Sequence, residues 1–171
     1  ERVVQVCRAV IPDATIVMGN IHADFFYESL LINELADVVV HGEGERTIVD
    51  LARCLAERAP DLETVAGISF RREGAVVTTA RRPYIQNLDE LPFPAWHLLP
   101  RESFRIFNFA RVREPGMLIQ GSRGCPYGCT FCSLKIMGSK RRVRSVGHIA
   151  DEFEYLYDRF GYVQPSFVDP I

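Results

Sequence analysis

The sequence has no apolar run long enough to cross a membrane and no segment typical of a secretion signal. Its longest apolar stretches, such as Leu35–Val40, contain a charged residue, whereas a membrane-spanning helix needs about 20 consecutive apolar residues. The first residues, from Glu1 on, lack the basic segment and apolar core of a signal peptide. Charge is nearly balanced, since 22 Asp and Glu against 20 Lys and Arg give −2 over 171 residues. This composition, with 47% hydrophobic residues, excludes disordered, collagen-like and low-complexity chains.

Cysteines are few and unevenly placed. There are five, an odd number, and three of them lie within eight residues. A secreted disulfide framework does not fit this pattern, so we expect metal-ligand cysteines in a reducing cytoplasm. The other two, Cys7 and Cys54, lie on the apolar faces of predicted helices and are expected to be buried packing residues.

Positive charge is concentrated in residues 101–144, which hold ten Lys and Arg residues and two Glu, a net charge of +8. The densest run, residues 140–144, lacks the interleaved aromatic residues of a stacking platform for nucleic acid. An anionic-ligand pocket and a solvated face both fit this segment, and no nucleic-acid partner is expected.

The first 59 residues alternate predicted helices and strands. Two apolar runs, Ala14–Met18 and Asp37–Val40, are typical of parallel strands buried on both faces. The predicted helices are one that ends near Val10, Phe25–Leu35, and one from Glu43 to about Arg58. This alternation predicts right-handed crossovers and a doubly wound sheet. Because two strands make too small a sheet, and because the chain opens with Glu1, we expect a piece of a longer protein.

A β-hairpin and a proline-bearing strap are predicted next. Gly67–Arg71 and Ala75–Thr79 flank a short glycine-bearing turn of the kind that joins antiparallel strands. The strap, Leu88–Trp96, has two prolines separated by an aromatic residue, which excludes a helix. Three apolar side chains are expected to pin the strap to a domain surface: Leu91, Phe93 and Trp96.

The pattern of residues 115–171 predicts one βαβ unit. Its length corresponds to a quarter to a third of an α/β barrel. The strands are Met117–Gln120 and Ser166–Val168, and the helix is Val146–Phe160. Ser145 is expected to cap the start of this helix and Gly161 to end it. Its apolar stripe consists of Ile149, Phe153, Leu156, Tyr157 and Phe160.

Three cysteines lie in the loop after the first strand of this unit. Cys125, Cys129 and Cys132 have the spacing Cys-x3-Cys-x2-Cys, and glycines at 121, 124 and 128 relieve the turns between them. Three thiolates on so short a loop can converge on one metal centre. Structural zinc and ferredoxin clusters normally take four protein ligands. Three ligands therefore predict an iron–sulfur cubane with one open iron, which points to catalysis rather than to storage of electrons.

Zinc is the alternative for this loop. His148 could supply a fourth ligand from the following helix, or two of the cysteines could form a redox pair. With zinc, the chain would be a stabilised, non-catalytic binding module that uses the basic segment.

The loop Gly121–Cys132 resembles the signature of the radical S-adenosylmethionine (radical SAM) enzymes, including the aromatic residue Phe131 before the last cysteine. The resemblance implies that the three cysteines hold a 4Fe-4S cluster whose open iron chelates S-adenosylmethionine. Reductive cleavage would then give methionine and a 5′-deoxyadenosyl radical. It also implies that Phe131 lies beside the adenine and Asp169 near the polar end of the cofactor. The Gly-Gly-Glu motif that other members carry there is absent from this sequence.

Upstream motifs resemble the cobalamin-binding domain that precedes the barrel in one large subfamily. Met18–Ala23 is similar to its Gly-Gly-x-His-Ala turn, Asp37–Glu45 to its Gly-Glu-Gly-Glu turn, and the strap to its connector. Asn20 replaces the second glycine, and asparagine tolerates the left-handed backbone better than most residues. The resemblance implies cobalamin contacts at Gly19, His22, Gly42, Glu43 and Gly44. For His22 we favour a hydrogen-bonded turn histidine over a cobalt ligand.

The resemblance predicts three parts of an α/β chain. Residues 1–80 would be the C-terminal part of a Rossmann-like (flavodoxin-like) cobalamin-binding domain, 81–114 a connector, and 115–171 the start of a radical SAM partial barrel. The expected cofactors are a 4Fe-4S cluster, S-adenosylmethionine and, in the longer protein, cobalamin.

The implied reaction is radical-initiated methyl transfer, cyclisation or rearrangement on a small-molecule, lipid or tetrapyrrole-like substrate. The implied partner is an electron donor such as flavodoxin or ferredoxin, and the fragment alone is expected to show little turnover. A methylthiotransferase of RNA or protein is the alternative enzyme. Such enzymes usually carry a second cluster and an RNA-binding tail, and neither is visible in this sequence.

Overall fold

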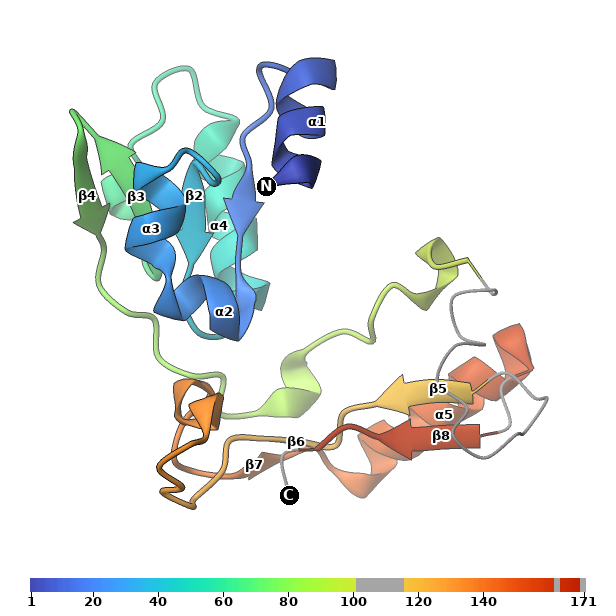
Figure 1. Cartoon of the computed structure of the whole chain (residues 1–171). Helices are drawn as coiled ribbons and strands as arrows, with labels where there is room; N and C mark the ends of the chain where they lie inside the picture. The colour runs from blue at the N-terminus through green and yellow to red at the C-terminus, as the bar shows by residue number, and fades with distance from the viewer. Residues whose placement is uncertain (101–115, 162–163, 170–171) are drawn as a thin grey trace. The chain divides into compact units, whose positions relative to one another are not determined.

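The computed structural model describes residues 1–100, 116–161 and 164–169. The chain divides into two compact units, Glu1–Tyr84 and Ile85–Ile171. Each unit combines helices with strands, as Figure 1 shows, so the expected α/β class is confirmed. Within the described ranges, no helix is long and apolar enough to cross a membrane.

The first unit is built on a four-stranded sheet with the order β1-β2-β3-β4. Strands β1 (Val17–Met18) and β2 (Val38–Val40) are parallel, as predicted, although β1 is shorter than its apolar run. The hairpin of β3 (Ile68–Arg72) and β4 (Ala75–Thr78) pairs antiparallel with β2. The hairpin therefore extends the first sheet, which makes it a mixed sheet of four strands instead of the two expected.

Helices cover both faces of this sheet (Figure 1). Side chains alternate along β2: Val38 and Val40 pack with Leu51 and Cys54 of α4 (Gly44–Leu55), while Val39 joins the opposite core. That second core contains Ala23 of α2 (Asn20–Phe25) and Leu30 and Leu31 of α3 (Tyr27–Ile32). Burial on both faces explains why β2 is a continuous run of valine.

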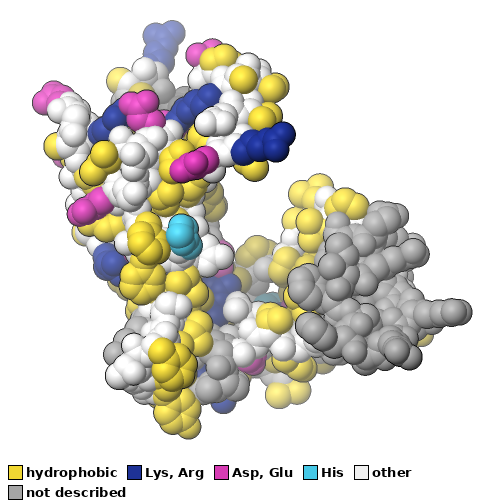
Figure 2. All heavy atoms as spheres, viewed as in Figure 1, with side chains coloured by type: hydrophobic (Ala, Val, Ile, Leu, Met, Phe, Trp, Pro, Cys, Tyr) yellow, Lys and Arg dark blue, Asp and Glu magenta, His cyan; other side chains and the backbone are white. Residues whose placement is uncertain are grey.

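Two details of the first unit differ from the sequence-based expectation. The helix expected over Phe25–Leu35 is the shorter α3 (Tyr27–Ile32), and a separate helix that was not predicted, α2, precedes it with a bend at Phe26. Cys54 is buried, as predicted, but Cys7 is exposed. The reason is that α1 (Arg2–Val10) places only Val4 against the rest of the unit, so its apolar face stays largely open. Elsewhere on the visible face of this unit, acidic and basic side chains lie interspersed (Figure 2).

Asp37 ties α1 and the start of β1 to the beginning of β2. Its Oδ1 accepts a hydrogen bond from Arg8 Nη2 at 2.7 Å, and its Oδ2 accepts one from the backbone N–H of Ile16 at 2.7 Å. Partial burial pushes the pKa of Asp37 upward, but the hydrogen bonds from Arg8 and Ile16 outweigh it and hold that pKa below its ordinary value. The ionised carboxylate is therefore the form that stabilises this junction.

Asp37→Asn should lower the free energy of unfolding of the intact protein by roughly 0.5–1 kcal/mol at pH 7, because the ion pair is more than a third exposed. The lowered pKa contributes stability that is present above the ordinary carboxyl pKa near 4 and is lost as the pH falls through the folded-state value. Urea unfolding at pH 7 and at pH 3 measures this. If the difference in free energy of unfolding between wild type and variant were the same at both pH values, the stabilising role of the ionised Asp37 carboxylate would be contradicted.

The second unit contains the predicted βαβ arrangement. Strands β5 (Gly116–Ile119) and β8 (Gln164–Phe167) are parallel, and α5 (Val146–Phe160) connects them. The Ser145 side chain accepts a hydrogen bond from the His148 backbone N–H at 3.1 Å, and Gly161 ends the helix with φ of 66°. Both predicted helix ends are therefore confirmed.

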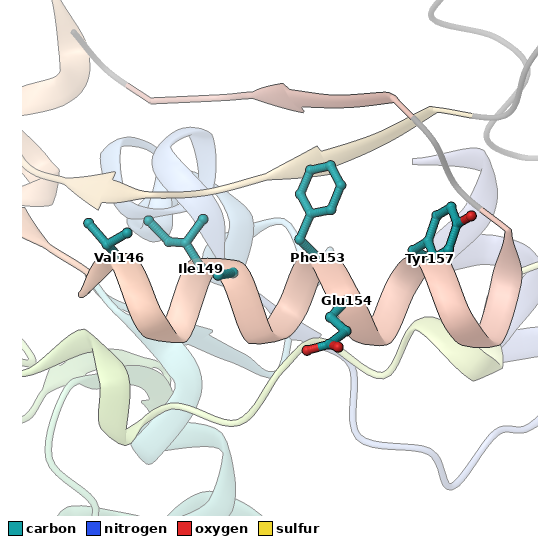
Figure 3. A pocket seen from close by; sticks show the side chains of 6 residues that line it. Val146, Ile149, Phe153, Glu154 and Tyr157 are labelled. Atoms are coloured by element: carbon teal, nitrogen blue, oxygen red, sulfur yellow. The ribbon is translucent and has the colours of Figure 1, made fainter.

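One face of α5 is only partly covered. Leu156 is buried beside Ile119, and Ile149, Phe153 and Phe160 pack around them, as predicted. Tyr157 is exposed instead, because it lies at the margin of the stripe, and Tyr155 takes its place in the cluster. A hollow of about 580 Å³ along this helix is lined by Val146, Ile149, Ala150, Phe153, Glu154 and Tyr157, and Figure 3 shows these side chains.

The strap packs on α5, as its apolar residues predicted. The ring of Phe93 lies 4.9 Å from that of His148, and Trp96 Nε1 donates a hydrogen bond to Glu152 Oε1 at 3.0 Å. The other oxygen of Glu152 pairs with Arg144 Nη1 at 2.5 Å, and side-chain exposures of 1% and 10% make this a buried ion pair. Three-residue 3-10 helices at Leu88–Glu90 and Trp96–Leu98 replace a fully extended path.

Candidate functional site

The cysteine loop is closed at its base by a short strand pair that the sequence did not predict. Strand β6 (Ser122–Arg123) pairs antiparallel with β7 (Arg142–Val143), and the Arg144 N–H donates to the Gly121 carbonyl at 2.9 Å. The three cysteines therefore lie on an excursion whose two ends are held together beside the carboxyl end of β5.

One buried and one partly buried arginine belong to this base. Arg142 is 5% exposed and donates from Nη1 to the Ile85 carbonyl at 2.7 Å and from Nη2 to the Met137 carbonyl at 2.8 Å. Arg144 Nη1 donates to the Gln120 carbonyl at 3.0 Å. The densest basic run is thus partly internal, because the guanidinium groups of Arg142 and Arg144 satisfy main-chain carbonyls, whereas Lys140 and Arg141 are exposed, as expected for a solvated face. Residues 101–115 of the basic segment lie outside the described residues.

Gly124 is the glycine that the loop requires most strictly. Its φ is 82°, and a Cβ atom there would lie 2.3 Å from the Lys140 carbonyl oxygen. This close approach lets the Cys125 N–H donate to the Gly138 carbonyl at 3.1 Å. Gly128, by contrast, has open space around it. The turn before the first cysteine is therefore the tightly constrained one.

The three cysteines differ in exposure but share one loop. Cys125 is 9% exposed, Cys132 is partly buried, and Cys129 is exposed. The Cys132 N–H donates to the Cys129 carbonyl at 3.2 Å, and the Leu134 N–H points at Cys132 Sγ at 3.5 Å. All three thiols are free of disulfides. Across the described part of the chain, no three His, Cys, Asp or Glu side chains stand together as an assembled metal site.

This donor set fits an iron–sulfur cluster better than zinc. It offers three soft sulfur ligands from one loop, beside a main-chain N–H that can donate to sulfur. The proposed fourth zinc ligand is engaged elsewhere, since His148 Nδ1 accepts a hydrogen bond from Arg144 Nε at 3.0 Å and its ring stacks on Phe93. A tetrahedral site with His148 would have to break these contacts.

Of the two residues expected near S-adenosylmethionine, one lies within this loop and the other at the end of β8. Phe131 is 91% exposed, so its ring is available to a ligand. Asp169 uses Oδ1 to accept hydrogen bonds from the N–H groups of Gly121 at 2.7 Å and Ser122 at 2.9 Å. Asp169 thus joins the end of β8 to the start of the cysteine loop, a structural role that its sequence position alone did not reveal.

A second candidate site lies at the carboxyl ends of β1 and β2. A cavity of about 400 Å³ is lined by the predicted glycines 19, 42 and 44, together with Val17, Met18, Asn20, Val40, Glu45 and Ile48. Asn20 has φ of 76°, the left-handed conformation anticipated for it. His22 is exposed on α2, where its ring contacts Phe26, and does not line the cavity. Glu43 is buried at 8% and is not a lining residue either.

No protein-family model matches the chain. It is 33% identical over 170 residues to an uncharacterized methyltransferase of Pyrococcus horikoshii, which covers 98% of this chain and 36% of that protein. It is 34% identical over 165 residues to the anaerobic magnesium-protoporphyrin IX monomethyl ester cyclase of Rubrivivax gelatinosus. This match covers 91% of this chain and 28% of that protein. The chain thus spans about a third of the length of these relatives.

The fold is shared with a solved structure. OxsB, a cobalamin-dependent S-adenosylmethionine radical enzyme, superposes with a TM-score of 0.77 at 22% identity, covering 99% of this chain and 23% of that one. Among the relatives is the cobalamin-dependent radical SAM methyltransferase TokK of Streptomyces tokunonensis, which is 31% identical over 129 residues, covering 71% of this chain and 18% of that protein. The fold and this relative together define an α/β chain of the radical SAM class. Its relatives place it more narrowly: it belongs to the family of cobalamin-dependent radical SAM methyltransferases and related cyclases.

Proposed function

We propose that this chain carries the cluster-binding loop of a radical SAM enzyme and that Cys125, Cys129 and Cys132 hold a 4Fe-4S cluster. The observation that carries the proposal is three free thiols on one loop whose base is closed by β6, β7 and the Gly124 turn. Such a cluster, when bound, supplies the electron that cleaves S-adenosylmethionine.

The chain's own residues would prepare the site for this cofactor. Asp169 fixes the main chain at Gly121 and Ser122, so the first part of the loop starts from a set position. The Phe131 ring, exposed next to Cys132, would cover the adenine. Cys125, the most buried of the three, would exclude water from one side of the metal centre.

We propose that the cavity at β1 and β2 holds part of cobalamin. Gly19, Gly42 and Gly44 would let a flat macrocycle or its nucleotide tail approach the backbone at the carboxyl edge of the sheet. Glu43 and His22, which do not line the cavity, would act only through the turns that carry them. The cavity is far smaller than the cofactor, so this chain would supply one wall of the site.

The reaction we propose for the intact protein is methyl transfer, cyclisation or rearrangement on a small organic substrate, with flavodoxin or ferredoxin as electron donor. The relatives support this range, since one is a methyltransferase and another a cyclase acting on a magnesium porphyrin ester. A reducing cytoplasm is the compartment we propose, because it keeps cluster thiols reduced. The domain limits at residues 80 and 114 remain predictions.

The test is anaerobic reconstitution of the intact protein with iron and sulfide, followed by metal analysis and absorption spectroscopy. We expect about four iron and four sulfide per chain and a broad absorption band in the blue. A colourless protein that holds one zinc per chain instead would overturn the proposal and support the binding-module alternative.

A further inference from the structure

A buried carboxylate links the two turns that line the cavity. Asp24 of α2 is 6% exposed, and its Oδ2 accepts a hydrogen bond from the Gly42 N–H at 2.9 Å. Its Oδ1 lies 2.6 Å from His41 Nδ1 and 3.4 Å from Arg81 Nη2. Burial of a carboxylate is costly unless donors satisfy it, and here three donors converge on one group. Asp24 is not one of the residues expected at this site, because it directly follows the Met18–Ala23 motif and no part of that motif points to it.

His41 extends the hydrogen-bonded chain across the sheet. Its Nε2 lies 2.6 Å from Ser69 Oγ, which in turn lies 2.8 Å from Thr78 Oγ1. Because the Asp24 carboxylate faces Nδ1, we assign the ring proton to that nitrogen, with Nε2 accepting from Ser69. The chain of contacts therefore runs from β4 through β3 and the end of β2 to α2.

The Asp24–His41–Ser69 arrangement has the order of a hydrolase triad, but burial excludes that chemistry. Ser69 has no exposed surface and His41 is 5% exposed, so no substrate can reach the hydroxyl. The nearby ring of Tyr27, 5.1 Å from that of His41 and edge-on to it, closes the site further. The arrangement must act on its surroundings and not on a substrate.

The Asp24–His41–Ser69 arrangement is surrounded by the two walls of the cavity. One wall is the turn after β1, with Gly19 and Asn20, and Asp24 follows Asn20 by one turn of α2. The other wall is the turn after β2, with Gly42 and Gly44. Both turns contain a residue with positive φ, Asn20 at 76° and Gly42 at 66°. A single carboxylate on the first wall therefore holds the backbone of the second.

We propose that Asp24 and His41 are positioning residues that set the spacing of these two turns and thereby the affinity of the cavity for its ligand. The choice of cobalamin as ligand rests on the proposed function, whereas the coupling of the turns rests on the contacts above. An amide in place of the carboxylate has one acceptor oxygen instead of two, so in Asp24→Asn the side chain can accept from Gly42 or from the protonated Nδ1 of His41 but not from both.

The experiment titrates the intact protein with hydroxocobalamin and, separately, follows backbone hydrogen exchange without ligand in peptides that cover residues 19–26 and 41–46. Asp24→Asn should weaken cobalamin binding about tenfold, the effect of one lost hydrogen bond to a buried group, and should speed exchange in both peptides. Asp37→Asn is the matched control: it removes a structural carboxylate of the same unit at the opposite end of β2, and should leave both readouts at the wild-type level.

A second pair of variants covers the case in which Asp24→Asn does not fold. His41→Asn keeps an N–H donor near the position of Nδ1 and should bind like wild type, whereas His41→Leu removes it and should bind about tenfold more weakly. Unchanged exchange and affinity in Asp24→Asn or His41→Leu would overturn the positioning role. Absence of cobalamin binding in wild type, with faster exchange in the variants, would reject cobalamin and keep the coupling of the turns.

Discussion

Replacing Cys125, Cys129 or Cys132 with alanine in the intact protein is expected to abolish reductive cleavage of S-adenosylmethionine, by at least about 100-fold. Each thiolate supplies a third of the protein ligands to the proposed cluster, so the loss of one leaves two thiolates to hold the metal. Release of methionine and 5′-deoxyadenosine under dithionite measures the cleavage. Iron content after reconstitution gives a second readout that does not depend on turnover.

The control for these variants is Cys7→Ala. Cys7 is an exposed cysteine outside the loop, so its loss should change neither iron content nor cleavage. The assignment would be wrong if all three loop variants kept a full complement of iron and wild-type cleavage. A loss in only one of the three would show that the other two thiols do not ligate the metal.

The largest expected effect on stability comes from the ion pair beneath the strap. Glu152→Gln should lower the free energy of unfolding by about 3 kcal/mol, because it leaves the buried Arg144 guanidinium without its counter-charge. The amide oxygen can still accept from Trp96, but the amide NH2 then faces Arg144, so the variant loses both the charge and the acceptor of Arg144 Nη1. Urea unfolding at neutral pH, followed by tryptophan fluorescence, measures the loss at the one tryptophan of the chain.

Glu154→Gln provides the matched comparison on the same helix. Glu154 is exposed, and the same neutralisation there should change stability by less than about 0.5 kcal/mol. If both variants lost equal stability, the effect would come from the net charge of α5 and not from the Arg144 pair.

Local signals predicted the elements of this fold well, because each is fixed by nearby residues. Ser145 and Gly161 bound α5, and the glycine-bearing turn between β3 and β4 marks the hairpin. The attachment of the hairpin to β2 could not be predicted, since pairing between distant strands leaves no local pattern. The short helix α2 was missed because Gly19 and Asn20 are typical of a break in the chain, so the helix was expected only from Phe25 on.

The sequence predicted which residues form the candidate sites, but not which residues hold those sites in place. The spacing of the cysteines identified the loop, and the glycine turns identified the cavity. The residues that hold these turns are ordinary in sequence: Asp24 lies inside a helix, and Arg142 lies in a basic run that is typical of a solvated surface. Charged side chains like these can be buried because they form hydrogen bonds with main-chain groups that are distant in the sequence. A single sequence does not show which distant groups form such hydrogen bonds.

The closed base of the cysteine loop bears on how the protein survives damage. Its contacts, the β6–β7 pair and the Gly124 turn, involve main-chain groups and no sulfur atom. Oxygen that destroyed the proposed cluster would therefore leave the base of the loop in place, so the polypeptide could take up fresh iron and sulfide without refolding.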